Sequence, residues 1–445
     1  MNQFFLFSCT TISLLLIITT STTHRTPISV QRTLDDPHNH RHLLSYNEDP
    51  LAAEPWLEFE NPRLKNAYIA LQAWKEAILS DPNNITADWI GPDPCAYTGV
   101  FCWPAPDNPC ERTVAGIDIN HADIAGHLPH ELGLLYDLAV FHLNSNRFCG
   151  TIPQSLTNLY RLHELDLSNN RFAGKFPELF LNFQNLKYLD IRYNEFEGGL
   201  PYKLFDKHFD AIFVNDNRFS SALPENIGNS PVSVIVMANN MFEGCVPASL
   251  GNMSETLNEL IITNNGLSSC FPSELGKLRN LTVLDVSRNK IVGGLPDSIG
   301  DLNSLEQLNV GYNMMSGKIP TGICRLPNLA SFLYNDNFFT EEAPDCLKLP
   351  RLDDRMNCFR GRPDQKTDVE CRRFLSRAVN CSSFDCGNSY KPPAPMCPPP
   401  QLSPNPINGS PSPPVTFSPP PAKSTPPMCQ CVKPPPQPAN PPPTV

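Results

Sequence analysis

An asparagine recurs every 23 to 25 residues through the middle of this chain, and this period constrains the fold more than any other feature. Each asparagine ends a short phrase of alternating apolar residues, such as Leu165-Asp-Leu-Ser-Asn-Asn170, and a proline usually follows seven residues later. A repeat of this length would form one coil, which is too short to bury its apolar side alone. We therefore expect the coils to stack around one continuous core. The asparagine side chains would then satisfy backbone groups that the turns bury. The asparagines are Asn146, Asn170, Asn194, Asn217, Asn240, Asn265, Asn289, Asn313 and Asn337.

One further unit, from Ile117 to Pro129, carries Ala122 where the asparagine is expected. Terminal repeats of a solenoid are usually atypical, so we count ten leucine-rich repeats in residues 114–344. The strand-like phrases would form a concave sheet, with Leu165 and Leu167 pointing inward and their neighbours outward. The proline-centred returns would form the convex side.

The composition divides the chain into six segments. Residues 1–23 are apolar without Asp or Glu, which predicts a secretory signal peptide; a membrane anchor is less favoured because Ser8, Thr10 and Thr11 interrupt the apolar run. No later segment is apolar over 18 residues, so we expect no membrane span. The predicted segments are 1–23 signal peptide, 24–54 disordered linker, 55–113 N-terminal cap, 114–344 repeats, 345–390 Cys-rich C-terminal cap, and 391–445 Pro-rich tail with 23 prolines in its 55 positions.

The cysteines favour an oxidising compartment, because fifteen of the sixteen lie beyond the predicted signal peptide. Before the repeats, a helix is expected from Asn61 to Asp81-Pro82. The short loop that follows, from Cys95 to Cys102, would help to cover the first coil. We expect a disulfide between these two cysteines.

Two further disulfides are predicted within the repeats. Cys245 and Cys270 each lie five residues after their asparagine, and equal phase would place them one strand spacing apart, within bonding range. Cys324 and Cys346 would similarly join the last two coils. Cys110 and Cys149 either pair with each other or leave one thiol unbonded. The pairing of Cys358, Cys371, Cys381 and Cys386 stays open.

The sequence contains no catalytic constellation: no phosphate-binding glycine loop, zinc-protease motif or nucleophile elbow, so we expect no enzyme and no cofactor. The net charge of −11 argues against nucleic acid and favours a cationic partner. Five sequons are compatible with glycosylation: Asn84, Asn252, Asn280, Asn380 and Asn408.

Solenoids bind on their concave face, and here the outward strand positions are rich in acids and aromatic rings. Such a surface suits a basic polypeptide. Acids in Leu-Asp-Leu phrases are also common without any ligand, so a purely structural role is an equal alternative. Tyr193 and Tyr334 also lie in or beside these strips. The candidate peptide-binding residues are Glu164, Asp166, Tyr188, Asp190, Arg192, Phe213, Asp216, Glu259, Asp285, Tyr312 and Asp336.

Several phrases outside the generic repeat resemble the plant leucine-rich repeat extensins. They are Asn61–Ile78, Ala115–Gly126, Phe141–Gly150, Asn229–Ser233 and Met356–Cys358, within a resemblance that covers residues 60 to about 390. The fold class is therefore α/β, a plant-type extracellular leucine-rich-repeat solenoid with disulfide-bonded caps, followed by a disordered Pro-rich tail.

The resemblance implies a secreted protein of the cell wall, or apoplast. In that family the repeat domain binds basic signalling peptides of the rapid alkalinization factor type and often forms a homodimer. The tail attaches to wall polysaccharide or wall protein, and receptor kinases act indirectly. This tail departs from the family pattern, because Ser418-Pro-Pro-Pro421 is its only serine followed by three prolines, and Tyr390 is the only tyrosine in or next to it. Strong covalent attachment to the wall is therefore in doubt.

A second function remains open from the sequence. Similar secreted plant repeat proteins inhibit wall-degrading hydrolases such as polygalacturonase, and an assay for loss of that activity would separate the two hypotheses.

Overall fold

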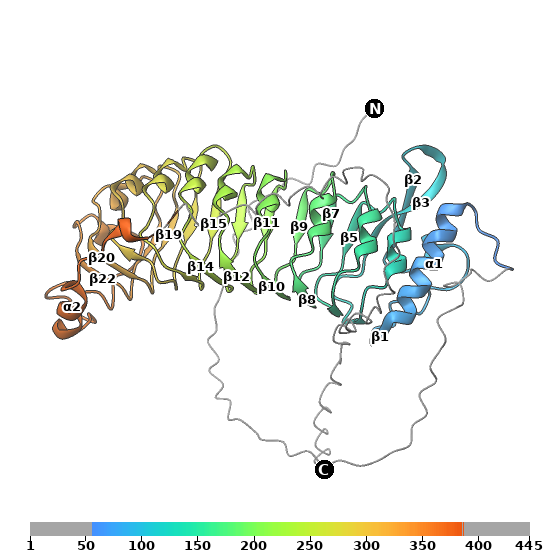
Figure 1. The fold of residues 1–445 in the computed structure, drawn as a ribbon, viewed down its shortest axis with the longest axis horizontal. Helices are drawn as coiled ribbons and strands as arrows, with labels where there is room; N and C mark the ends of the chain where they lie inside the picture. Colours follow the sequence, from blue (N-terminus) through green and yellow to red (C-terminus); the bar gives the residue numbers. More distant parts are fainter. Residues whose placement is uncertain (1–55, 385, 387–445) are drawn as a thin grey trace, which may run out of the picture. The chain divides into compact units, whose positions relative to one another are not determined.

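The computed structural model describes residues 56–384 and residue 386, and these form the solenoid predicted from the repeats (Figure 1). Each coil contributes a short strand to one long sheet, a second strand after the turn, and a 3-10 helix on the return. The predicted signal peptide, linker and Pro-rich tail, with the sequon at Asn408, lie outside the described residues.

The long sheet carries the strands that precede the asparagines. Strands β2 and β3 form an antiparallel hairpin, and every later strand is parallel to its neighbours. Equivalent leucines are in register, as for Leu165 beside Leu189, so the same positions point inward in every coil. The strands are β2 (Val100–Ala105), β3 (Asn108–Asp118), β5 (Val140–His142), β7 (Glu164–Asp166), β9 (Tyr188–Asp190), β11 (Ala211–Phe213), β13 (Val234–Val236), β15 (Glu259–Ile261), β17 (Val283–Asp285), β19 (Gln307–Asn309), β21 (Ser331–Leu333) and β23 (Arg351–Asp353).

Two shorter sheets are formed by the strands that follow the asparagines. One contains β1 (Ile78–Ser80), β4 (Ala125–Gly126), β6 (Arg147–Gly150), β8 (Arg171–Lys175), β10 (Glu195–Gly198), β12 (Arg218–Ala222), β14 (Met241–Gly244) and β16 (Gly266–Leu267); the other contains β18 (Val292–Gly293), β20 (Met314–Lys318) and β22 (Phe338–Glu341).

A proline stands at or just before the start of each return, where its missing N–H costs no helical hydrogen bond. They are the 3-10 helices η2 (His130–Leu134), η3 (Gln154–Asn158), η4 (Glu178–Asn182), η5 (Tyr202–Asp206), η6 (Glu225–Asn229), η7 (Ala248–Met253), η8 (Ser273–Lys277), η9 (Asp297–Asp301), η10 (Ile323–Arg325) and η11 (Cys346–Lys348).

The core is one continuous cluster of leucines and phenylalanines from the first coil to the last. A run of phenylalanines two residues after the asparagines is stacked coil on coil, with Phe196, Phe219 and Phe242 at centroid separations of 6.3 Å. Because such stacked rings are fully buried and nearly parallel, they fix the spacing between coils as well as excluding water.

The asparagines act as expected. Asn170 accepts a hydrogen bond from the backbone N–H of Phe148 at 2.9 Å and donates to the carbonyl of Leu143 at 2.8 Å, both in the preceding coil. It also donates within its own turn, to the carbonyls of Leu167 and Ser168. The same pattern repeats along the series, so each asparagine joins two coils through buried backbone groups. The carbonyls are shared: that of Leu167 accepts from both Asn170 and Asn194.

The solenoid is one coil longer than the sequence pattern indicated. Strand β23 pairs with β21, and Asn357 accepts from the N–H of Phe339 and donates to the carbonyl of Tyr334, as a ladder asparagine does. The predicted boundary at residue 344 is therefore too early. The coil was missed because only 20 residues separate Asn337 from Asn357, and no proline follows at the usual distance.

The N-terminal cap contains the predicted helix, α1 (Pro62–Ala77), with Asn61 accepting from the N–H of Leu64 at its N-terminus. The helix ends four residues before Asp81, because Ile78–Ser80 forms β1 and pairs with β4. The expected disulfide joins Cys95 and Cys102.

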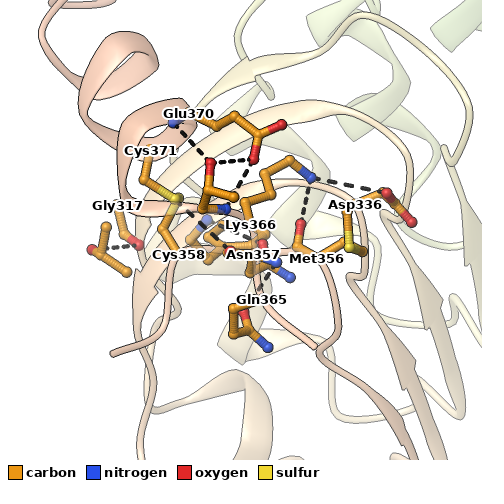
Figure 2. Close-up of a disulfide and its surroundings, with 12 residues drawn as sticks. Gly317, Asp336, Met356, Asn357, Cys358, Gln365, Lys366, Glu370 and Cys371 are labelled. Atoms are coloured by element: carbon orange, nitrogen blue, oxygen red, sulfur yellow. Dashed lines mark hydrogen bonds and ion pairs between the residues drawn. A yellow bond between two sulfur atoms is a disulfide. The ribbon is translucent and has the colours of Figure 1, made fainter. Parts of the chain in front are cut away.

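The C-terminal cap is built on a second helix, α2 (Asp368–Leu375), which begins with a capping box formed by Thr367 and Glu370. A disulfide between Cys358 and Cys371 fixes this helix to the last coil, and Lys366 donates to the carbonyl of Met356 beside it (Figure 2). The ring of Phe374 also stacks on Phe338 of β22.

The predicted bond between Cys245 and Cys270 is wrong. Cys245 is bonded to Cys386, and Cys270 is bonded to Cys381. The reason is the register of the second sheet, in which Glu243 lies beside Gly266 and Cys270 beside Val292.

Paired residues in this sheet differ by two in their distance from the asparagine of their own coil: Glu243 lies three residues after Asn240, and its partner Gly266 lies one residue after Asn265. Cysteines at the same distance from their asparagines are therefore offset by about 7 Å along the strand direction. The equal-phase assumption holds in the long sheet but not here. The structure instead places residues 381 and 386, at the end of the described chain, against the two cysteines.

The expected disulfide between Cys324 and Cys346 is present. Cys110 and Cys149 are not bonded to each other: the thiol of Cys110 is exposed, and that of Cys149 is buried and lies 3.5 Å from the carbonyl oxygen of Gly126. Across residues 56–384, no helix is both long and apolar enough to cross a lipid bilayer.

Candidate functional site: the outward face of the long sheet

The outward side chains of the long sheet form a continuous surface, called the strand face below. Its residues stand in rows along the solenoid because the strands are in register. The middle row runs through Asp118, His142, Asp166, Asp190, Phe213, Val236, Ile261, Asp285, Asn309, Leu333 and Asp353.

Four predicted residues meet at the centre of this face. The hydroxyl of Tyr188 lies 3.2 Å from Asp190, and Nε of Arg192 lies 3.0 Å from the same carboxylate. The guanidinium of Arg192 also lies over the ring of Phe213, 5.2 Å from its centroid. The strands β9 and β11 thus bring an acid, a cation and two rings into one cluster.

The carboxylate of Asp190 is buried, which the sequence did not indicate. The side chain has no exposed surface, and this burial raises its pKa to about 6 despite the neighbouring Arg192. The nearby charge of Asp166 acts in the same direction as burial. Burial likewise raises the pKa of Tyr188. Asp190 therefore cannot present a charge directly to a ligand, whereas the partly exposed Arg192 can.

The other acids near the N-terminal end of the face also have partners. Glu164 lies 3.2 Å from Nε2 of His142; this contact raises the pKa of His142 and lowers that of Glu164. Asp166 accepts from the backbone N–H and the hydroxyl of Ser168.

Asp216 stands in the next row, at the turn after β11, with a positive φ of 55°. Its carboxylate accepts from the side-chain amides of Asn215 and Asn239, and Asn239 in turn accepts from Asn264. This chain of amides links three coils along the surface.

The C-terminal half of the face is less acidic than predicted. Asp285 is largely buried, which raises its pKa, and it accepts from Ser287 and Asn309. The exposed ring of Tyr312 lies under Arg288, with the guanidinium 4.1 Å from its centroid.

Two predicted acids stand apart from these clusters. Asp336 lies 3.9 Å from Lys366 of the C-terminal cap (Figure 2). Glu259 is half-buried between Val234 and Val283.

Tyr334 does not belong to the strand face. It occupies an inward position, is fully buried, and hydrogen-bonds to Glu342.

Sequence reasoning missed an apolar strip between the acidic patches. Phe213, Val236 and Ile261 are consecutive in the middle row, and Val234 and Val283 flank Glu259 in the adjacent row. These side chains are only half-buried. The signal was present in the phrase Val234-Ile-Val236, which is apolar at outward as well as inward positions. A face with apolar residues at its centre and charges around them has the composition of a protein-binding surface.

The sequons at Asn84, Asn252, Asn280 and Asn380 are exposed, so glycosylation stays a prediction compatible with the fold. Among residues 56–384 and 386, no group of three or more histidine, cysteine or acidic side chains has the arrangement of a metal site.

Two family models match the chain and agree with the repeat fold. The family model described as leucine rich repeat matches residues 135–198 and 255–315, and the one described as leucine rich repeat N-terminal domain matches residues 65–103. The fold and its outward face thus define a leucine-rich repeat solenoid similar to those of plant repeat ectodomains.

The chain belongs to the leucine-rich repeat extensin-like family. It is 62% identical over 360 residues to leucine-rich repeat extensin-like protein 7 of Arabidopsis thaliana, with 80% of this chain and 83% of that protein covered. It is 67% identical to leucine-rich repeat extensin-like protein 5 of the same plant, with 81% of this chain covered but 42% of that protein. The match to this chain thus covers less than half of the length of several such relatives.

Solved structures share the fold. The ectodomain of the Arabidopsis receptor kinase HAESA in complex with an extended IDA peptide hormone is 25% identical, with a TM-score of 0.53 over 66% of this chain and 54% of that one. A plant ice-binding protein is 22% identical, with a TM-score of 0.54 over 65% of this chain and 95% of that one. The fold alone therefore does not determine the ligand.

Proposed function

We propose that this protein is secreted to the cell wall, where the strand face of its repeat domain binds basic signalling peptides of the rapid alkalinization factor type and links wall organisation to cell growth. The observation that carries the proposal is the composition of the face, in which an apolar strip around Phe213, Val236 and Ile261 lies between acidic groups. The peptide complex of the similar HAESA ectodomain supports a peptide as the ligand.

The remaining parts of the proposal come from the family. Its members carry an extensin-like region, so we propose that residues 391–445 attach the repeat domain weakly to wall polysaccharide or protein. Signalling would pass through separate receptor kinases, and the repeat domain would form a homodimer.

Charge reversal on the face tests the peptide site. Asp118 is exposed and Glu259 is half-buried, so the double variant D118K/E259K reverses two charges, and shifts the net charge of the face by four units, without touching the core. We expect weaker binding of a basic peptide, by about tenfold or more, and a smaller decline in affinity when NaCl is raised from about 50 to 500 mM.

The matched control is E197K/E243K, which reverses two exposed acids on β10 and β14 of the second sheet. Equal loss of affinity in both double variants would mean that net charge, rather than the strand face, determines binding. Unchanged affinity in D118K/E259K would exclude the proposed surface.

A further inference from the structure

Asp190 occupies an outward position of the strand face and yet contributes no surface. Asp118 stands in the same row and is exposed, whereas the side chain of Asp190 is completely covered. Its own strand and the next one provide the cover, through Tyr188, Arg192 and Phe213.

The two oxygens of the Asp190 carboxylate have different partners. Oδ1 accepts from the backbone N–H of Arg192 at 3.1 Å, and Oδ2 lies 3.2 Å from the hydroxyl of Tyr188 and 3.0 Å from Nε of Arg192. The guanidinium is held between Asp190 and the ring of Phe213, with about a third of its side chain exposed. The negative charge is thus hidden, and its positive partner is at the surface.

The elements packed around Asp190 supply few other charges. On β7, Asp166 is its direct neighbour, and Glu164 lies beside Tyr188 and is engaged with His142.

On the other side, β11 presents Phe213, and Asp216 beyond it is engaged by Asn215 and Asn239. Among the described residues, Arg192 is the cation in an ion pair with Asp190, and Asp166 is the like charge that opposes its ionisation.

Resting on the proposed function of this face, we propose that the Asp190–Arg192 pair is a proton-operated gate for cationic peptides. When Asp190 is ionised, the pair is neutral and the surrounding acids attract the peptide. When Asp190 takes up a proton, Arg192 is left as an uncompensated cation at the centre of the face and repels the peptide. Because burial raises the pKa of Asp190 to about 6, the change falls between pH 5 and 7.

The size of the effect follows from linkage. If a bound cation lowers the pKa of Asp190 by about one unit, to about 5, affinity at pH 5 is about fivefold lower than at pH 7. Binding at pH 6 then releases roughly 0.4 protons per peptide. The decline in affinity at pH 5 and the proton release at pH 6 both disappear when residue 190 cannot ionise.

The test uses the full chain and an acetylated, amidated peptide of arginine, leucine and glycine, whose charge is constant between pH 5 and 7. In the wild type we expect the fivefold decline in affinity at pH 5. The variant Asp190→Asn should bind about ninefold more weakly than the wild type at pH 7, somewhat below the wild type at pH 5, with no pH dependence. Calorimetry at pH 6 in buffers of different ionisation enthalpy measures the proton release directly.

Two variants complete the design. His142→Gln removes a histidine of the same row whose pKa Glu164 raises, and the pH dependence should persist in this variant. Asp301→Asn, an exposed carboxylate in η9, controls for net charge. Thermal unfolding of each variant checks that it is folded.

The outcomes separate the two proposals. A pH dependence that persists in Asp190→Asn and disappears in His142→Gln would overturn the gate, as would equal wild-type affinity at pH 5 and 7. No binding at either pH would contradict the proposed function itself.

Discussion

Cys381 is bonded to Cys270, 111 residues earlier in the chain, and with the neighbouring bond between Cys386 and Cys245 it fixes the end of the described chain to the middle of the solenoid. The C-terminal segment thus runs back along the coils to which it is bonded. The residues from 245 to 386 are closed into one covalent loop, so the coils in this loop cannot separate fully while the bonds are intact.

Removal of one of these bonds should therefore destabilise the C-terminal half. While Cys245–Cys386 is intact, the Cys270–Cys381 bond closes a loop of about 30 residues, which runs through residues 245–270 and 381–386. The double variant C270S/C381S opens this loop, and chain entropy predicts a loss of about 3.6 kcal/mol in the free energy of unfolding. Urea denaturation measures the loss. The matched variant C95S/C102S opens a loop of seven residues and should lose about 2.4 kcal/mol. A larger loss in C95S/C102S would contradict the ordering.

The asparagine ladder makes a second prediction. Replacing Asn217 with alanine leaves the N–H of Phe196 without its partner in a buried turn. The carbonyls of Ile191 and Val214 each lose one donor but keep the side-chain amides of Asn194 and Asn240. A buried polar group left unpaired costs about 1–3 kcal/mol, so we expect a loss of about 1–3 kcal/mol in unfolding free energy, measured by urea denaturation. Asn185→Ala, at an exposed asparagine with one backbone partner, should lose less than about 1 kcal/mol. Similar losses in both variants would show that the ladder position has no special role.

The ladder and the long sheet could be predicted from the sequence because they depend on a strict period. The position of each inward leucine and each asparagine follows from the spacing alone. The last coil was missed because its spacing is shorter, and the Cys245–Cys270 bond was predicted wrongly because the second sheet has a different register. Register is a property of paired strands, and a single chain's period does not reveal it.

The candidate site was predictable only in part. The sequence placed Tyr188, Asp190, Arg192 and Phe213 on one face, and the structure brings them together. It could not show that Asp190 is covered, because coverage depends on the rotamers of its neighbours rather than on strand alternation.

The pair of His142 and Glu164 gives a third prediction. Because Glu164 raises the pKa of His142, this histidine stabilises the fold below its unfolded pKa, and the stabilisation is lost as pH rises through its folded pKa. Glu164 has a lowered pKa, so its contribution is lost as pH falls through that folded value. In Glu164→Gln the pKa of His142 should fall, as measured by NMR titration of the imidazole, with His142→Gln to assign the signal. An unchanged titration would show that the two side chains do not interact in solution.

Asp190 gives the last prediction, which concerns stability rather than binding. Its folded pKa, raised from 3.8 to about 6, lies above that of the unfolded chain, so the folded state binds the proton more tightly. The contribution of this group is fully present below about pH 4 and is lost as pH rises through 6. A shift of about two units corresponds to about 3 kcal/mol.

We therefore expect the free energy of unfolding of Asp190→Asn, relative to wild type, to rise by up to about 3 kcal/mol between pH 4 and pH 7.5 in urea titrations. The matched control is Asp301→Asn, which replaces an exposed carboxylate and is compared with wild type at the same pH values. A difference between Asp190→Asn and wild type that does not change with pH would mean that Asp190 titrates normally, so the buried ion pair would have no influence on the charge of the strand face near pH 6.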